Sequence, residues 1–437
     1  MSSPLARPAA VAGAPGSPSA APGGPGASAA GPPQAGASCR ADADACPGAL
    51  RLHDAADGPL ARVRIPGGRI TGGQLTALRE LAVEWGDGHL ELTSRANLQL
   101  RALRAAPPAH LAERLAEAGL LPSPTHELVR NIAASPLLID PEPVTTLDRE
   151  LCADPVLAAL PGRFLFAIDD GSGDVAFSAD VAVLPSGAVL FAGRDLGLRV
   201  PVAHTVPVLL AAAHAFLVLA AQDASSGRPR PWRVRELADG PARMAASTAA
   251  ALDVTLIAPD PSLRRPALRE PVGMIPRSGG RTAVGALVPL GRLGGAALRA
   301  LERARELVVT PWRGVIVPDL SPAEAAAWMR KLAGAGLETG ADSRWAGVTA
   351  CAGRPGCAKA LADVRSDADA ATRAGSGLPV HWVGCARGCG SPAAPHVRVE
   401  ATATGYTVAA MPGGDDKAAG SVPVTEVAAA IAALRKG

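Results

Sequence analysis

Four cysteines toward the C-terminus form two close pairs. Cys351 and Cys357 delimit the segment CAGRPGC, and Cys385 and Cys389 lie in the segment GCARGC. Thiolates are the usual ligands of iron–sulfur clusters, and four thiolates in two close pairs satisfy one [4Fe-4S] cubane. The glycines and the proline in these segments let the backbone turn tightly around a bulky inorganic group. The pattern therefore predicts a [4Fe-4S] cluster held by these four residues.

A zinc site and simple burial are the alternatives to a cluster at these cysteines. Structural zinc sites favour cysteine pairs with about two to four intervening residues, and the five residues between Cys351 and Cys357 count against zinc. Buried apolar cysteines in glycine loops would need no metal at all. The total of seven cysteines is odd, and Cys39, Cys46 and Cys152 stand apart, which does not indicate a secreted disulfide framework. We expect a reducing, cytoplasmic compartment.

A second group of polar residues lies on two predicted strands nearer the N-terminus. On one continuous strand over residues 92–102, the side-chain period of two puts four polar side chains opposite an apolar face. These four are Arg95, Asn97, Gln99 and Arg101, and Arg62 and Arg64 share a face of an earlier strand. Arginine grips carboxylates through two parallel hydrogen bonds, so these faces suit a ligand with many carboxylates, such as a tetrapyrrole precursor. A solvated strand face is the alternative for each arginine.

An internal repeat supplies the elements that position these residues. Residues 64–103 and residues 286–320 share one order, in which a glycine-containing loop is followed by a helix and a strand. In the first copy, four apolar residues lie on one helical stripe, namely Leu75, Leu78, Ala82 and Trp85. A repeat of this kind indicates a duplicated architecture with a site at the interface of its two halves.

Composition and periodicity describe the rest of the chain. The most apolar segment, PVLLAAAHAFLVLAA at residues 207–221, is shorter than the roughly 20 residues that span a bilayer, so we expect a buried helix and no membrane association. The net charge of +3 argues against a nucleic-acid partner. The predicted parts are a disordered tail at 1–45, a half-domain at 46–110, an α/β region at 111–275, a second half-domain at 276–335 and a cluster domain at 336–437.

Several blocks resemble the sulfite and nitrite reductase superfamily, and within it the precorrin-3B synthase branch. The cysteines occur in TACAGRPGCAKALADVR and LPVHWVGCARGC, and upstream lie CPG with DGPLARVR, then LTSRANLQLR, LVRNI and LPGRFLFAIDDG. The blocks keep the family's order over residues 46 to 405. The resemblance implies an α+β fold, in which two ferredoxin-like half-domains form a pseudo-duplicated unit beside mixed α/β domains that bind the cluster and a tetrapyrrole.

The resemblance also implies roles for individual residues. In the superfamily, the blocks matching TSRANLQ, RN and PGRF line a cavity for a tetrapyrrole and an anion, which implies binding by Arg95, Arg130, Asn131 and Arg163. Sulfite-reducing relatives carry a second basic residue where this sequence has Leu165, and this departure disfavours reduction of a small anion.

The implied reaction is an oxygen-dependent hydroxylation of precorrin-3A at a ring-bridging carbon, with lactone formation from a neighbouring acetate arm, in aerobic cobalamin biosynthesis. A mononuclear non-haem iron is implied as well. His381 is one candidate ligand, although a histidine on a strand beside a core is more often only hydrogen-bonded. No GxGxxG follows a predicted strand, so electrons are expected from a separate NAD(P)H-linked reductase or a ferredoxin.

Two alternative functions are compatible with the sequence. One is a sirohaem-dependent nitrite or sulfite reductase, in which Cys389 bridges the cluster and the sirohaem. The other is a non-catalytic electron carrier or a zinc-stabilised scaffold, although a carrier has no need of duplicated half-domains and aligned arginines.

Overall fold

The structure of the protein is a computed structural model. It describes residues 46–266, 270–392, 394–411 and 421–435. The predicted disordered tail at residues 1–45, with Cys39, lies outside the described residues.

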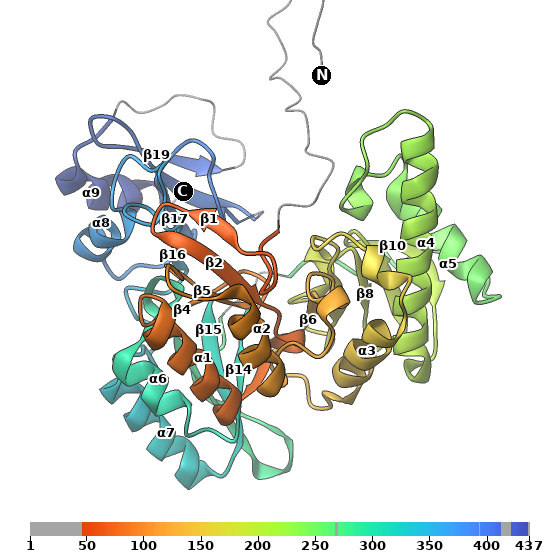
Figure 1. Cartoon of the computed structure of the whole chain (residues 1–437), viewed down its shortest axis with the longest axis horizontal. Coiled ribbons are helices and arrows are strands. Elements are labelled where there is room, and N and C mark those ends of the chain that lie inside the picture. The colour runs from red at the N-terminus through yellow and green to blue at the C-terminus, as the bar shows by residue number, and fades with distance from the viewer. Residues whose placement is uncertain (1–45, 267–269, 393, 412–420, 436–437) are drawn as a thin grey trace, which may run out of the picture. The chain divides into compact units, whose positions relative to one another are not determined.

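Two antiparallel sheets carry the internal repeat (Figure 1). The first has the order β1 (His53–Ala55), β2 (Gly58–Val63), β5 (Leu98–Leu100), β4 (His89–Leu92) and β13 (Arg292–Gly294). The second has the order β11 (Gly273–Pro276), β12 (Thr282–Leu287), β15 (Gly314–Leu320), β14 (Glu306–Val309) and β3 (Arg69–Thr71). The strand orders match one to one, with β3 and β13 in corresponding places.

The two half-domains exchange one strand each. β3 belongs to the first half in sequence but pairs with β14 of the second, where Thr71 lies opposite Glu306. β13 belongs to the second half but pairs with β4 of the first, where Gly294 lies opposite His89. Buried side chains of both halves form a single apolar core. The exchange and the shared core make the halves one folding unit.

Helices α1 (Gly72–Trp85), α6 (Gly295–Leu301) and α7 (Pro322–Gly334) follow one another in space beside these sheets, and α2 (Pro108–Glu117) packs on α1 (Figure 1). The side chain of Thr71 accepts from the N–H of Gln74, and the Gln74 side chain accepts in return from the N–H of Thr71. This reciprocal pair satisfies N–H groups that the first helical turn leaves open. Leu75, Leu78 and Ala82 of the predicted stripe are buried, and Trp85 is half-buried and packs against the same core.

The middle of the chain forms a mixed sheet with three helices. Its order is β10 (Arg194–Arg199), β9 (Ala188–Phe191), β8 (Val181–Val183), β7 (Phe166–Ile168) and β6 (Ile132–Ala134). The helices are α3 (Glu142–Ala153), α4 (Thr205–Ser225) and α5 (Gly240–Ala251). Within the described residues α4 alone is long and apolar enough to cross a membrane by length and composition. Half of its most apolar window is buried inside the protein, and Val208, Ala212 and Phe216 belong to the apolar core of this region.

The C-terminal part is a smaller mixed sheet. It consists of β16 (Val348–Ala350), β17 (Val380–Val383), β18 (His396–Ala401) and β19 (Tyr406–Met411) in that order, with α8 (Val364–Ala371) and α9 (Val424–Arg435). The first three strands are parallel, and β19 is antiparallel to β18. With the duplicated halves and the two mixed sheets, the predicted α+β class is confirmed.

The predicted continuous strand over residues 92–102 is wrong. β4 ends at Leu92, and β5 begins at Leu98 after a turn. In this turn the N–H of Thr93 donates to the carbonyl of Asn97 at 2.9 Å, and the N–H of Asn97 donates to the Thr93 hydroxyl at 3.0 Å. A threonine hydroxyl offers the backbone an alternative to strand pairing, and here that alternative prevails.

This turn changes where the four polar residues lie. Arg95 and Asn97 belong to the turn, Gln99 lies in the centre of β5, and Arg101 follows the end of that strand. The four side chains therefore do not form one row on a strand.

Candidate functional site

Parallel strands bring the two cysteine pairs to one edge of the C-terminal sheet. Cys351 follows β16 directly, and Cys385 follows β17 by two residues. Because β16 and β17 run parallel, their carboxyl ends meet at the same edge. The second cysteine of each pair lies in the loop that continues from there.

The four thiols lie close enough to affect one another's charge. Burial raises the pKa of Cys389, Arg387 lowers it, and the thiols of Cys351, Cys385 and Cys357 raise it further. The other three thiols therefore act on Cys389, although the four come from two loops.

The sulfur atoms do not converge as ligands of one ion do. Zinc binds sulfur at about 2.3 Å, so four zinc-bound thiolates crowd around one point. Within the described ranges, the one group of three or more ligand atoms with single-ion spacing is an aspartate trio in another part of the fold. Cubane ligands bind separate corners of a larger body, so their sulfur atoms do not need the spacing of ligands to one ion.

Two glycines and one backbone N–H group shape the two loops that carry the four cysteines. The N–H of Gly384 points to the sulfur of Cys351 at 3.2 Å, the type of hydrogen bond that tunes cluster thiolates. A Cβ on Gly384 would lie 2.6 Å from the Cβ of Ala360, and one on Gly353, whose φ is +65°, would lie 2.8 Å from Val364. A side chain at Gly384 would push the second cysteine loop away from the segment after Cys357, and one at Gly353 would push the first cysteine loop away from α8.

His381 supports the second cysteine loop. Its Nε2 lies 3.0 Å from the carbonyl oxygen of Cys389, and its Nδ1 lies 2.7 Å from the hydroxyl of Thr349. Nε2 therefore donates to Cys389, and Nδ1 accepts from Thr349. Burial lowers the pKa of His381 to about 3, so the ring is neutral. With both ring nitrogens engaged, this histidine orients the loop and has no nitrogen left for an iron.

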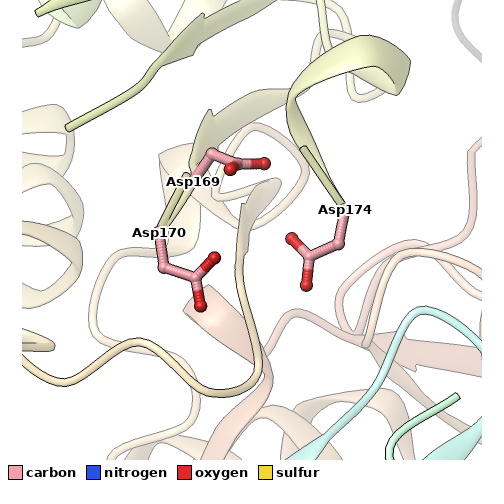
Figure 2. Close-up of side chains that lie close together, drawn as sticks. All are labelled: Asp169, Asp170 and Asp174. Carbon is pink, nitrogen blue, oxygen red and sulfur yellow. The ribbon is translucent and has the colours of Figure 1, made fainter. Parts of the chain in front are cut away.

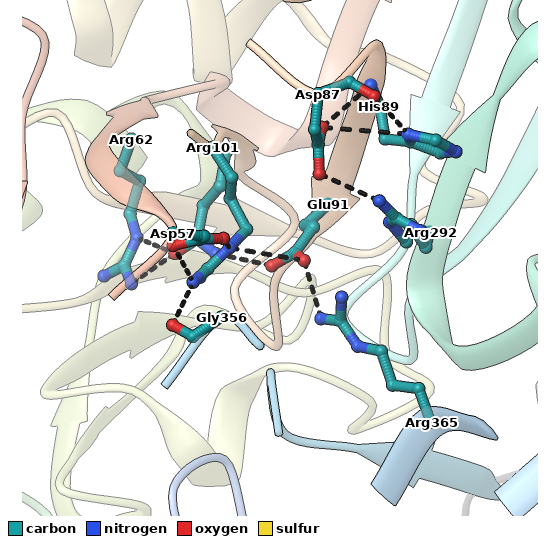
Figure 3. A network of polar contacts seen from close by, with 10 residues as sticks. Asp57, Arg62, Asp87, His89, Glu91, Arg101, Arg292, Gly356 and Arg365 are labelled. Carbon is teal, nitrogen blue, oxygen red and sulfur yellow. Dashed lines mark hydrogen bonds and ion pairs between the residues drawn. The ribbon is translucent and has the colours of Figure 1, made fainter. Parts of the chain in front are cut away.

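Arg101 joins the first half-domain to the first cysteine loop (Figure 3). Its guanidinium donates twice to Asp57, at 2.9 and 3.0 Å, and once to the carbonyl of Gly356, at 2.8 Å. Glu91 lies 3.7 Å away and forms a shorter ion pair, 2.6 Å, with Arg365 of α8. Arg101 is therefore neutralised mainly by Asp57, and Arg365 is neutralised by Glu91.

Arg62 and Gln99 belong to the same polar face. The strand register sets Arg62 opposite Gln99 and Gln99 opposite Glu91. The Arg62 guanidinium donates to the Gln99 carbonyl at 2.6 and 2.9 Å, and the Gln99 amide donates to Glu91 at 3.4 Å. The row joins β2, β5 and β4, and Glu91 at its end pairs with Arg365 of α8.

Two asparagines connect the first half-domain with the middle sheet. The side-chain amide of Asn97 donates to the side-chain carbonyl of Asn131 at 3.4 Å, and its own carbonyl accepts from the N–H of Ile65 at 2.8 Å. Asn131 donates to the carbonyl of Phe164 at 3.0 Å. Both asparagines are buried in the contact between the first half-domain and the middle sheet.

Arg130 and Arg64 are buried as well. Arg130 makes a two-pronged ion pair with Asp148 of α3, at 2.7 Å on each side, and donates to the carbonyl of Leu120. Arg64 donates to the carbonyl of Leu128 at 3.3 Å.

Arg95 differs from these residues. Burial and the charge of Arg233 lower its pKa to about 10, while Asp180 partly opposes them. Across the described residues its guanidinium has no hydrogen-bond acceptor and no ion pair, whereas Arg233 pairs with Asp180 at 2.6 Å. Arg163 is exposed and lies over the ring of Trp232, 4.7 Å from its centre. Arg95 is thus a desolvated cation that lacks a counter-ion, and such groups mark candidate binding sites.

The polar contacts reveal residues that sequence reasoning missed. Asp57, Glu91 and Asp148 neutralise predicted ligand-binding arginines, and Arg233 lies near Arg95. No local pattern marks these long-range pairs. Arg313 was also missed, although the second repeat places it in a turn like that of Arg95.

Asp169, Asp170 and Asp174 form the aspartate trio, in the loop after β7 (Figure 2). Both carboxylate oxygens of Asp169 already accept two backbone N–H groups each from the following loop. The Ser135 hydroxyl donates to Asp174 at 2.6 Å. The trio therefore organises its own loop, and the described residues do not identify ligands for the implied mononuclear iron.

Comparisons with known proteins find similar sequences and folds among nitrite and sulfite reductases and a precorrin-3B synthase. Residues 53–118 match the family model of the nitrite/sulfite reductase ferredoxin-like half domain. The chain is 28% identical over 384 residues to the ferredoxin–nitrite reductase of Synechococcus elongatus, covering 76% of this chain and 74% of the relative. It is 26% identical over 386 residues to the precorrin-3B synthase of a Sinorhizobium species, covering 83% and 81%. The solved structure of Mycobacterium tuberculosis NirA has a similar fold, with a TM-score of 0.62 at 19% identity over 85% of this chain and 79% of that one.

Over most of its length the chain is similar to a nitrite reductase and to a precorrin-3B synthase, and residues 53–118 match the ferredoxin-like half domain of nitrite and sulfite reductases. The two relatives carry different enzyme names, so the choice between these two reactions rests on the residues of this chain.

Proposed function

We propose that the protein is an enzyme of the precorrin-3B synthase type. It would hydroxylate precorrin-3A at a ring-bridging carbon with oxygen, and a neighbouring acetate arm would close a lactone. As in any monooxygenation, one oxygen atom enters the macrocycle and the other leaves as water, with two electrons from a donor and two protons.

The observation that carries the proposal is the environment of Leu165. This residue occupies the place where sulfite-reducing members of the superfamily have a second basic residue. It is 5% exposed and packs in an apolar cluster with Val175 and Leu190. A small anion such as nitrite or sulfite needs several cations around it, and this position offers none.

Arg95 and Arg163 are the residues proposed to hold carboxylates of the macrocycle. Arg95 is desolvated without a counter-ion, and a bound carboxylate would supply one. Arg62, Arg64 and Gln99 are proposed to line the site behind these two. Their bonds to neighbouring groups leave them less free to move.

The other predicted ligand-binding residues have structural roles in this proposal. Arg101 and Arg130 already hold Asp57 and Asp148, and Asn97 holds Asn131. Each of these bonds joins two elements whose separation would open the site.

Cys351, Cys357, Cys385 and Cys389 are proposed to hold a [4Fe-4S] cluster, with the N–H of Gly384 donating to one thiolate. When bound, the cluster relays single electrons from an external donor. The donor is proposed to be a ferredoxin or a separate reductase, since one relative is named for ferredoxin. A cytoplasmic location keeps the thiolates reduced.

The proposal is tested with anaerobically purified protein, precorrin-3A, a chemical reductant and isotopically labelled oxygen. The expected product gains one labelled oxygen atom by mass spectrometry, and C385S, which lacks a cluster ligand, forms none. Turnover of nitrite or sulfite with a reduced viologen, together with sharp visible bands of bound sirohaem, would instead establish the reductase alternative.

A further inference from the structure

The turn that carries Arg95 occurs again in the second half-domain. There the N–H of Thr310 donates to the carbonyl of Gly314 at 2.9 Å, and the N–H of Gly314 donates to the Thr310 hydroxyl at 2.9 Å. Thr93 and Asn97 make the same two bonds in the first half. The equivalence places Arg313 where the first repeat has Ala96.

Arg313 lies at a backbone position that disfavours it. Its φ is +65°, and that of Ala96 is +57°. An L-residue in the left-handed region costs on the order of 1–2 kcal/mol, and glycine avoids this cost. A long side chain held at such a position points to a use for that side chain.

Two glycines make room for the Arg313 side chain. A Cβ on Gly291 would lie 2.8 Å from the Cδ of Arg313, and a Cβ on Gly390 would lie 2.9 Å from one of its terminal nitrogens. Both glycines also have positive φ. The guanidinium therefore lies against the backbone that immediately follows Cys389.

The charges around Arg313 come from several elements. Burial lowers the pKa of Arg313. Three negative groups, Glu91, Cys351 and Glu270, raise it, and the positive charge of Arg365 lowers it. Glu91 is held by Arg365 at 2.6 Å, so it is already paired. Counting only residues that the structure describes, the Arg313 guanidinium has no hydrogen-bond acceptor and no ion pair. A desolvated cation of this kind needs an anion nearby.

The geometry points to Arg313 as the counter-ion of the cluster, a positioning residue that stabilises the cluster's reduced form. This inference rests on the proposed [4Fe-4S] site. A cubane with four thiolate ligands is anionic in both redox states and gains one negative charge on reduction. A cation beside it therefore raises the reduction potential, since net charge is one of the terms that set cluster potentials.

The test is a redox titration of the holoprotein without any tetrapyrrole, with iron and sulfide content measured on the same samples. Arg313→Gln removes the charge, Arg313→Lys keeps it, and Arg305→Gln is the control because the Arg305 side chain is 89% exposed. We expect R313Q to lower the equilibrium constant for reduction at least tenfold, which is about 59 mV for a one-electron couple. R313K and R305Q should stay within about threefold of wild type, because the charge is kept in R313K and solvent screens the charge of Arg305.

Each outcome decides the inference. An unchanged potential in R313Q, or an equal shift in R305Q, would overturn it. If R313Q cannot retain iron and sulfide while R313K can, the need for charge is supported; if both lose the cluster while folded, shape rather than charge is required and the inference fails. A wild-type protein without iron and sulfide would refute the proposed cluster itself.

Discussion

Replacing Arg101 with methionine tests the contact between the first half-domain and the cysteine loop. The Arg101 side chain is 7% exposed, and that of Asp57 is 15% exposed. Burial lowers the pKa of Arg101. The carboxylates of Asp57 and Glu91 outweigh this effect, so the pKa of Arg101 is raised overall. Removing one partner of a buried pair costs about 3–5 kcal/mol, because the other charge stays behind unpaired. Arg101→Met also frees the carbonyl of Gly356.

The assay is urea denaturation of the cluster-free protein followed by circular dichroism, with iron content measured after reconstitution. R101M should lose about 3–5 kcal/mol of unfolding free energy and retain less iron. Asp57→Ala should be comparably destabilising, and the double variant should cost less than the sum of the two. Arg305→Met is the control, since Arg305 is 89% exposed and lies 3.9 Å from Asp319. An R101M protein within about 0.5 kcal/mol of wild type, with full iron content, would refute the role of this contact.

Three further changes test other parts of the site. Arg95→Gln should weaken tetrapyrrole binding at least tenfold, about 1.4 kcal/mol, at unchanged iron content, whereas the exposed Arg194→Gln should not; titration by absorbance measures both. Gly384→Ala should reduce iron and sulfide content because its Cβ meets Ala360, while Gly334→Ala, which meets nothing within 4 Å, should leave both unchanged. Burial raises the pKa of Asp174 to about 6. The folded protein therefore binds a proton at this carboxyl more tightly than the unfolded chain does, and its stability falls as pH rises from about 4 to 6. Asp174→Asn should match wild type below this window and exceed it by about 1–3 kcal/mol above, and equal urea midpoints at pH 7 would contradict the reasoning.

Local sequence patterns predicted the parts of the structure that depend on neighbouring residues. The stripe of Leu75, Leu78 and Ala82 identified a helix because helical periodicity is local. The repeat was visible for the same reason, since each copy keeps its own order of elements. The exchange of β3 and β13 was not predictable, because which strand pairs with which is settled by packing between the halves.

The polar site was harder to predict from the sequence. The period-two argument failed at Thr93, where one hydroxyl group changes strand into turn and removes Arg95 and Asn97 from the strand face. The partners of Arg101 and Arg130 come from positions 44 and 18 residues away, so a local pattern does not reveal that these arginines are neutralised. Motif resemblance marked Arg95 as a candidate, but the lack of a counter-ion is visible only in the fold.

Arg313 shows what a closer use of the repeat reveals. The turn residues Thr93 and Thr310 occupy the same place in the two copies, and aligning them brings Arg313 next to the position of Arg95. The sequence contained this signal, but the hydrogen-bond pattern was needed to set the alignment.

The central claim is that the four cysteines hold a [4Fe-4S] cluster, and the most direct measurement is the iron and acid-labile sulfide content of anaerobically purified protein, with an electron paramagnetic resonance spectrum after reduction. We predict four iron and four sulfide per chain and a signal typical of a reduced cubane. C351S and C385S should lose the iron and the sulfide, and C152S should keep them. Stoichiometric zinc without sulfide, or a chain that binds neither metal, would contradict it.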